Sequence, residues 1–175
     1  MKAILMSIRP QWIEKIFNGE KTKETRKNFP KDFRGWVYMY CTKNGDRSIY
    51  LPWEFDCHIE NGEYVADCDF EKGNGKVVGR FWCDNVDEYS RYDTIRTSEI
   101  EKTCLTSTEI RNYANDKKVS FIDISKLEIF DTPKELNEFA TTKQQLVYIG
   151  QIQPIFQNIS LTKAPQSWQY IEVEE

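Results

Sequence analysis

The stretch from Ser7 to Lys27, with the sequence SIRPQWIEKIFNGEKTKETRK, constrains the fold of this chain more than any other segment. Pro10 stands where the first residue of a helix is expected, because its φ is preset and it needs no amide hydrogen there. Apolar residues follow at helical spacing and form one apolar face: Trp12, Ile13, Ile16 and Phe17. Asn18-Gly19 ends the helix, since glycine accepts the left-handed conformation of a helix C-cap. The stretch therefore predicts the end of a strand, a short helix and a second strand.

The second of these strands, residues 20–27, is polar on both faces. Alternation places Thr22, Glu24 and Arg26 on one face, and Lys21, Lys23 and Thr25 on the other. Neither face carries an apolar side chain, although the preceding helix is strongly apolar. We therefore expect this strand to line a solvent-filled cleft rather than a hydrophobic core.

Length and composition fit one globular domain. The 175 residues suffice for one hydrophobic core, and 39% hydrophobic with 14% aromatic residues argues against disorder. The net charge of −4 argues against a protein that coats long nucleic acids, whose surfaces are basic. A local basic cleft is compatible with that total, because binding follows the local field. We expect residues 1–175 to form a single domain.

Cysteine and histidine usage argues against a metal centre. The five cysteines are scattered without a Cys-x-x-Cys pair, so we expect buried reduced thiols and neither a metal nor a cofactor. These are Cys41, Cys57, Cys68, Cys83 and Cys104. His58 is the one histidine, and chain neighbours such as Cys57 and His58 rarely face each other as a catalytic pair. The sequence shows no signal segment and no long apolar run, so we expect a cytoplasmic protein without membrane contact.

Runs of β-forming residues predict several short strands. They lie at Lys2–Ile8, Trp36–Cys41, Lys76–Cys83, Val119–Phe130 and Trp168–Val173. Gly79 inside one run suggests a bulge or a close backbone approach, and Ser125-Lys126 suggests a kink in another. Regular alternation of strands and helices is missing. The pattern indicates an α+β chain built as a small mixed β-barrel with two or three short helices.

The remaining segments give weaker signals. A capping box from Thr106 to Glu109 predicts a helix that runs to about Asn115, and Pro133 predicts a helical turn with Leu136 and Phe139 buried. Ser48–Asn74 is rich in acidic residues, and we expect it to be an inserted hairpin or loop at the surface. Residues 141–159 show no clear pattern.

Three blocks of the sequence together resemble an ASCH domain. They are SIRPQWIEKIFNGEKTKETR, the central GKVVGRFWCD and the terminal PQSWQYI, with Gly19-x-Lys21-x-x-Glu24-x-Arg26 as the specific core. The pattern is similar to the variant found in phage and prophage proteins. It covers most of the chain except about residues 48–74 and 141–159. The resemblance implies a PUA-like β-barrel.

The resemblance also implies binding of RNA or a nucleotide in a cleft between the barrel and the N-terminal helix. Some small ASCH proteins hydrolyse the amide of acetylated cytidine with a lysine, a threonine and a glutamate. Lys21 falls on that lysine, but Glu24 stands at the threonine position, and Gly79 or Arg80 stands near the glutamate position. Amidohydrolase activity therefore does not transfer directly to this chain.

Lys21, Glu24 and Arg26 are the first candidates for binding RNA or a modified nucleotide. Guanidinium and ammonium groups bind phosphates or base edges, and a carboxylate accepts from an exocyclic amine. Further candidates near the same cleft are Ser7, Arg9, Lys27, Ser167, Trp168 and Tyr170. The last two share a strand face and would stack on bases, with core packing as the competing interpretation. We expect replacement of Lys21 and Arg26 by alanine to abolish binding with little change in stability.

Two other functions stay open. One is a hydrolase acting on RNA or a modified nucleoside, either amidohydrolase-like or a ribonuclease, with Lys21 as catalytic base and Glu24 as its partner. A lysine base needs a lowered pKa, for which Lys23 or Arg26 would supply a nearby cation. The other is a phage-encoded factor that acts on a host protein, with the acidic insertion at Ser48–Asn74 as its contact surface.

Overall fold

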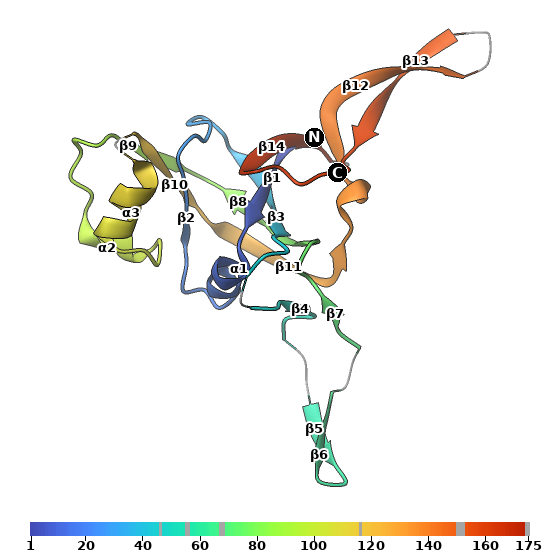
Figure 1. Ribbon diagram of the computed structural model, residues 1–175, viewed down its shortest axis with the longest axis horizontal. Helices are drawn as coiled ribbons and strands as arrows, with labels where there is room; N and C mark the ends of the chain where they lie inside the picture. The colour runs from blue at the N-terminus through green and yellow to red at the C-terminus, as the bar shows by residue number, and fades with distance from the viewer. Residues whose placement is uncertain (46, 55–56, 67–68, 116, 150–152, 174–175) are drawn as a thin grey trace.

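The computed structural model describes residues 1–175 apart from 46, 55–56, 67–68, 116, 150–152 and 174–175. Its centre is a seven-stranded sheet with the strand order β11-β8-β3-β1-β14-β12-β13. These strands are β1 (Lys2–Ile8), β3 (Gly35–Cys41), β8 (Val77–Cys83), β11 (Ser125–Lys134), β12 (Ala140–Ile149), β13 (Gln153–Ser160) and β14 (Trp168–Glu172). β1 and β3 are parallel, and the other neighbours pair antiparallel. The two chain ends lie close together in Figure 1, because β1 pairs with β14.

A three-stranded sheet lies beside this central sheet and carries the polar strand of the sequence. Its order is β2-β10-β9, with β2 (Lys23–Arg26), β9 (Val86–Tyr89) and β10 (Val119–Asp123). The chain passes from β10 into β11 through Ile124, so the run predicted as one strand contributes to both sheets. Lys126 has a φ of 44°, which confirms the kink predicted at Ser125-Lys126.

Three short α-helices and two strand pairs complete the described part of the chain. The helices are α1 (Pro10–Phe17), α2 (Thr97–Glu101) and α3 (Ser107–Ala114), followed by a 3₁₀ turn at Leu136–Glu138. The strand pairs are β4 (Tyr50–Leu51) with β7 (Glu71–Lys72), and β5 (Cys57–Glu60) with β6 (Glu63–Ala66). In Figure 1 the β5–β6 and β12–β13 hairpins project from the body in different directions, and α2 and α3 lie beside β9 and β10.

The β-rich α+β class predicted from the sequence is confirmed, but the pairing pattern is an open one. Among the described residues, the edge strands β11 and β13 do not pair with each other, so the central sheet does not close into a ring. The predicted helix after Thr106 is confirmed as α3, with both hydrogen bonds of its capping box formed. Pro133 lies within β11 instead of starting a helical turn, and that turn begins three residues later.

The inner strands β1, β3 and β8 of the central sheet are buried on both faces. One hydrophobic cluster joins Ile4, Met6, Val37 and Met39 of the sheet to Ile13 and Ile16 of α1. A second cluster on the opposite face contains Ala3, Leu5, Tyr38, Phe139 and Ile171. Strands covered on both faces read as continuous apolar runs, which is why Lys2–Ile8 and Trp36–Cys41 were recognisable in the sequence. A third cluster packs α3 against β9 and β10 through Ile110, Ala114, Val119 and Phe121.

The cysteine prediction is confirmed for the two thiols in the central sheet. Cys41 and Cys83 are unpaired and buried, and burial raises the pKa of both thiols to about 12. Cys104 is half-buried, and the side chains of Cys57 and Cys68 lie outside the described residues. Within the described ranges, no helix is long and apolar enough to cross a membrane.

Gly79 in β8 marks a close approach between strands, as the sequence suggested. A Cβ at this position would lie 2.6 Å from the carbonyl oxygen of Glu128 and 3.1 Å from Cε of Met39. The register with β3 also shifts beside it, between Met39 and Tyr40, which is typical of a β-bulge. Only glycine therefore fits here without moving the backbone of β11.

We expect Gly79→Ala to lower the free energy of unfolding by about 1–3 kcal/mol, because the added methyl group overpacks the contact with β11. Urea unfolding at constant m-value measures the change. Gly62→Asn is the matched control, since that glycine has a φ of 85° with open space around it and asparagine tolerates this conformation. A cost no larger than that of the control would contradict the close-approach interpretation.

Candidate functional site

A cleft of about 400 Å³ opens between α1, β2 and α3, and we refer to it as the Lys21 cleft. Residues from five parts of the chain line it. They are Ser7, Ile8, Arg9 and Trp12; Lys21, Glu24, Thr25 and Arg26; Thr42; Leu105, Glu109 and Tyr113; and Gln166 and Ser167. The cleft therefore combines the polar strand with segments that lie far away in the sequence.

The turn after α1 determines where Lys21 lies. Gly19 has a φ of 73°, and the amide of Lys21 then donates to the carbonyl of Lys15, so the chain folds back along the helix. The Nζ of Lys21 lies 5.2 Å from the centroid of the Trp12 ring and donates to the carbonyl of Thr103 at 2.6 Å. Lys21 is only 2% exposed, so its ammonium is held in one place.

Lys21, Glu24 and Arg26 form a connected polar network at the base of the cleft. The Nζ of Lys21 lies 3.3 Å from Oε2 of Glu24, and Nη1 of Arg26 donates to Oε1 of the same carboxylate. Arg26 also donates through Nη2 to the carbonyl of Ser7 at 2.7 Å. The hydroxyl of Ser7 donates to the carbonyl of Pro165 at 2.6 Å, which ties the end of β1 to the loop before β14.

This network is incompletely hydrogen-bonded. Oε2 of Glu24 and Nε of Arg26 are buried but have no hydrogen-bond partner within the described part of the chain, although Nζ of Lys21 lies 3.3 Å from Oε2. Buried polar groups are normally satisfied, and an unsatisfied one costs free energy. Both atoms are closed to solvent, so a ligand or water would complete these contacts only after neighbouring side chains shift.

Lys23 points to the other side of β2, into a separate hollow. Its Nζ lies 2.6 Å from Asp87, 2.9 Å from Glu99 and 2.7 Å from Asp123, and we refer to these four residues as the Lys23 cluster. Burial opposes the charged form of Lys23, but hydrogen bonds to the three carboxylates outweigh it and raise its pKa. Hydrogen bonds from Lys102 and Lys23 lower the pKa of Glu99 to about 2.

The arrangement of Lys21 and Lys23 corrects the prediction that the two share a strand face. Regular β-structure begins at Lys23, so the alternation does not extend back to Lys21. The ammonium of Lys23 is occupied by its three carboxylates and does not serve as a neighbouring cation for Lys21. Hollows lie on both sides of the strand, but its own side chains are largely buried.

The structure brings together six of the predicted ligand-binding residues in the Lys21 cleft: Ser7, Arg9, Lys21, Glu24, Arg26 and Ser167. Lys27 lies at its margin, with Nζ 5.0 Å from the centroid of the Tyr113 ring. Trp168 and Tyr170 do not line the cleft. Their rings pack in the aromatic part of the first core cluster, against Phe29 and Phe33.

Several residues of the cleft were not among the predicted ones. Trp12, which the sequence placed on the apolar face of the first helix, lies partly buried at the cleft. Glu109 and Tyr113 come from α3, about 85 residues further along the chain, and only the tertiary structure reveals their position. Glu109 and Tyr113 are four residues apart, so they share a helix face that differs from the face of the apolar Ile110 and Ala114. This spacing is the sequence signal that could have identified them.

The described residues contain no group of three or more histidine, cysteine, aspartate or glutamate side chains arranged to hold a metal ion. The Lys21 cleft itself contains three cationic side chains, Arg9, Lys21 and Arg26, against the carboxylates of Glu24 and Glu109. Glu109 accepts from the amide and hydroxyl of Thr106, and the backbone hydrogen bond lowers its pKa. The cleft is thus a polar, slightly cationic site with aromatic side chains on its walls.

Comparison with known proteins bears on the fold. No protein-family model matches the chain, and no curated protein matches its sequence. Two crystal structures of an ASCH protein from Zymomonas mobilis superpose over almost the whole chain. A single-residue mutant has a TM-score of 0.50 at 14% identity, over 98% of this chain and 91% of the other. The second has a TM-score of 0.50 at 13% identity, over 97% and 87%. The chain therefore has an ASCH-like fold, and the phage variant stays a prediction.

We expect Lys23→Gln to lower the free energy of unfolding by about 2–3 kcal/mol at pH 7, because it leaves three carboxylates without their common cation. The expected loss is smaller than the cost of breaking a fully buried ion pair, because the three carboxylates are partly exposed. Lys118→Gln is the matched control, because Lys118 pairs with Glu88 at the surface and its loss costs about 1 kcal/mol or less. Equal losses in the two variants would contradict a special role for the cluster.

The Lys23 cluster also makes the free energy of unfolding depend on pH in the acidic range. Hydrogen bonds outweigh burial and lower the pKa of Asp87, and the pKa of Glu99 falls to about 2, so both carboxylates ionise more readily in the folded than in the unfolded chain. Their contribution is complete above the unfolded pKa values and is lost as the pH falls from about 5 towards 2. Chemical unfolding across this range should show a smaller acid loss for Lys23→Gln than for the wild type.

Proposed function

We propose that this chain binds RNA or a modified nucleotide in the Lys21 cleft, as part of one ASCH-like domain in which residues 48–74 are an insertion. The observation that carries the proposal is the buried Lys21–Glu24–Arg26 network, in which polar atoms at the cleft base lack hydrogen-bond partners. A site that keeps such atoms in a fixed arrangement is suited to a ligand with complementary donors and acceptors.

The size and chemistry of the cleft fit a single nucleotide. Its volume of about 400 Å³ lies in the range of small-molecule sites. Trp12 and Tyr113 provide aromatic faces for a base, and the carboxylate of Glu24 accepts from an exocyclic amine. Arg9 is exposed at the cleft, and no side-chain hydrogen bond or ion pair engages it within the described part of the chain, so its guanidinium is available for a phosphate.

A hydrolytic function of the same cleft is the second candidate, favoured by the 3.3 Å contact between Nζ of Lys21 and Oε2 of Glu24. The position at which the resemblance implies a glutamate, near Gly79 or Arg80, carries no carboxylate and does not line the cleft. Gly79 is buried in the central sheet, and Arg80 pairs with Glu128 and stacks over Trp36. Glu109 is the second carboxylate that lines the cleft, so it would have to supply any further acid or base.

The burial of Lys21 and Glu24 changes how the proposal must be tested. At 2% and 3% exposure, they form a buried pair, so in place of little change in stability we expect replacement of Lys21 to destabilise the fold. Loss of binding in such a variant would not separate unfolding from a lost contact. Arg9 is the better probe, because it lines the cleft and is exposed.

We expect Arg9→Gln to weaken binding of nucleoside monophosphates by about tenfold, the effect of losing one charge-assisted contact worth about 1.4 kcal/mol. Thermal shift measured over a range of nucleotide concentrations gives the affinities. The melting temperature without ligand should not change. Lys31→Gln, an equal charge change at an exposed site outside the cleft, should leave binding unaltered.

Two results would decide between the alternatives. No thermal shift with any nucleoside, nucleotide or short RNA, or equal shifts in wild type and Arg9→Gln, would overturn the binding proposal. Analysis of the same mixtures for products from acetylated cytidine and from short RNA tests hydrolysis. Binding without product formation would remove the hydrolytic candidate.

A further inference from the structure

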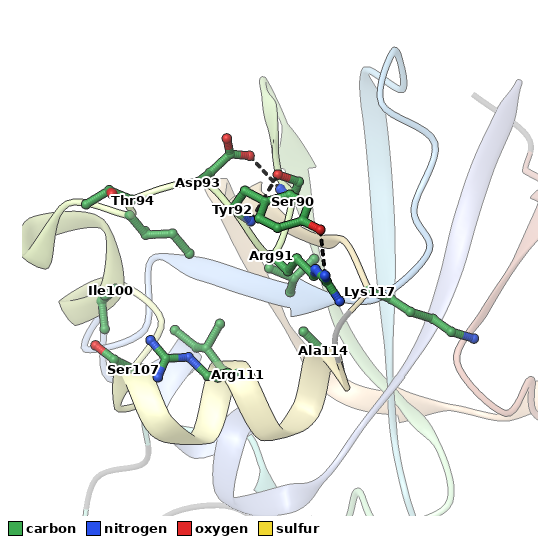
Figure 2. Close-up of a pocket in the computed structure, with 13 residues that line it drawn as sticks. Ser90, Arg91, Tyr92, Asp93, Thr94, Ile100, Ser107, Arg111, Ala114 and Lys117 are labelled. Carbon is green, nitrogen blue, oxygen red and sulfur yellow. Dashed lines mark hydrogen bonds between the residues drawn. The ribbon is translucent and has the colours of Figure 1, made fainter.

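A second hollow lies on the other side of α3, and we refer to it as the α3 pocket. Its volume is about 410 Å³, and the loop after β9, helix α3 and the start of β10 enclose it. Figure 2 shows Arg91 and Tyr92 of the loop over α3, which contributes Ser107, Arg111 and Ala114. None of its lining residues is shared with the Lys21 cleft.

Three cationic side chains line the α3 pocket: Arg91, Arg111 and Lys117. The described residues provide no ion pair to any of them, although the chain as a whole carries a net charge of −4. The guanidinium of Arg91 stacks over the ring of Tyr92 at 4.6 Å and donates to its hydroxyl. The one carboxylate of the lining, Asp93, accepts from the amide of Ser90 at 2.6 Å.

Some of the other described cations are ion-paired and some, such as Arg9 and Lys31, are not, so what sets these three apart is that they gather in one hollow. Lys15, Lys76, Arg80, Lys102 and Lys118 each pair with a glutamate. In a chain with more acidic than basic residues, such pairing is easily available. Cations that gather at a concave site without carboxylate partners raise the local concentration of anions.

The remaining lining gives the pocket an apolar floor and a polar rim. Ile100, Ile110, Ala114 and Val119 form the apolar part, and Ser90, Thr94 and Ser107 add hydroxyl groups. Tyr92 is 80% exposed, so one face of its ring is open beside the stacked Arg91. A ligand that carries a phosphate and a planar base matches this combination of arginine, hydroxyl and aromatic groups.

Helix α3 separates the two hollows. It presents Glu109 and Tyr113 to the Lys21 cleft, and Ser107 and Arg111 to the α3 pocket. A helix with its side chains is about 10–12 Å across, so the two hollows are only a few nucleotides apart along a single strand. Both sets of side chains therefore lie within reach of one bound oligonucleotide.

We propose that the α3 pocket binds a nucleotide of the same single-stranded RNA whose neighbouring nucleotide occupies the Lys21 cleft, so that the strand crosses α3. This inference rests on the proposed function. Arg91 and Arg111 contact phosphate, and Tyr92 stacks on a base. RNA of several nucleotides then binds more tightly than a mononucleotide, because it occupies both hollows.

The test is fluorescence anisotropy with a labelled ten-nucleotide single-stranded RNA at several salt concentrations. We expect the double variant Arg91→Gln with Arg111→Gln to weaken RNA binding by about tenfold or more. The slope of log K against log salt concentration should become about 1.4 less steep, because two phosphate contacts are lost. Affinity for a nucleoside monophosphate should not change. Both arginines are exposed, so the fold should persist. Lys31→Gln with Lys72→Gln is the control, with equal charge change at exposed positions outside both hollows.

The outcomes separate this inference from the proposed function. If Arg9→Gln weakens RNA binding but the Arg91/Arg111 variant binds RNA as tightly as the control variant, the inference is overturned. The proposed function is then left intact. Binding that responds to Arg91 and Arg111 but not to Arg9 overturns the Lys21 cleft as a binding site, and with it the inference that one strand occupies both hollows. Equal weakening of mononucleotide and RNA by the Arg91/Arg111 variant overturns the inference, as does the absence of RNA binding.

Discussion

The burial of charge along β2 is the constraint on which the rest of this structure depends. Lys23, Glu24 and Thr25 are buried and Arg26 nearly so, in a strand without a single apolar side chain. Charged groups leave water only when they are paired and hydrogen-bonded. The fold meets this condition by enclosing β2 between two polar arrangements: the Lys23 cluster on one side, and the network of Lys21, Glu24 and Arg26 on the other.

Both arrangements draw in segments from far along the chain, so the site and the fold are stabilised together. The carbonyl of Lys102, just after α2, accepts from the amides of Thr22 and Lys23, and the next carbonyl accepts from Nζ of Lys21. Glu99 of α2 contacts Lys23. The helical segment between β9 and β10 is thus attached to β2 through polar contacts, in addition to the apolar cluster around Phe121. This attachment places α3 as one wall of the Lys21 cleft.

How far the sequence predicts this molecule depends on whether a feature is local. Pro10, Gly19 and the capping box at Thr106 act over a few residues, so the helices α1 and α3 were predictable. The strands buried on both faces were predictable from their apolar runs. β9 and α2 have polar or irregular sequences, and β9 forms by pairing with the distant strand β10. β12 and β13 pair locally as a hairpin, but residues 141–159 show no clear sequence pattern. The candidate residues near β2 were found because they lie in one stretch, while Glu109 and Tyr113 depend on tertiary packing. The face of Lys21 was missed because strand alternation fails before Lys23.

The three hollows differ more in how far their cations are paired with carboxylates than in their volume. Of these three hollows, the one beside the Lys23 cluster is the largest, at about 600 Å³, yet its central ammonium already has three carboxylates within 2.9 Å. A ligand there would have to displace contacts that stabilise the fold. The Lys21 cleft is intermediate, because its network is paired but the cleft holds three cations against two carboxylates. In the α3 pocket, the cations have no carboxylate partners among the described residues. An anionic ligand therefore gains the most contacts with cations, and breaks the fewest ion pairs, in the two hollows on either side of α3. This favours the proposal that one single-stranded RNA contacts both.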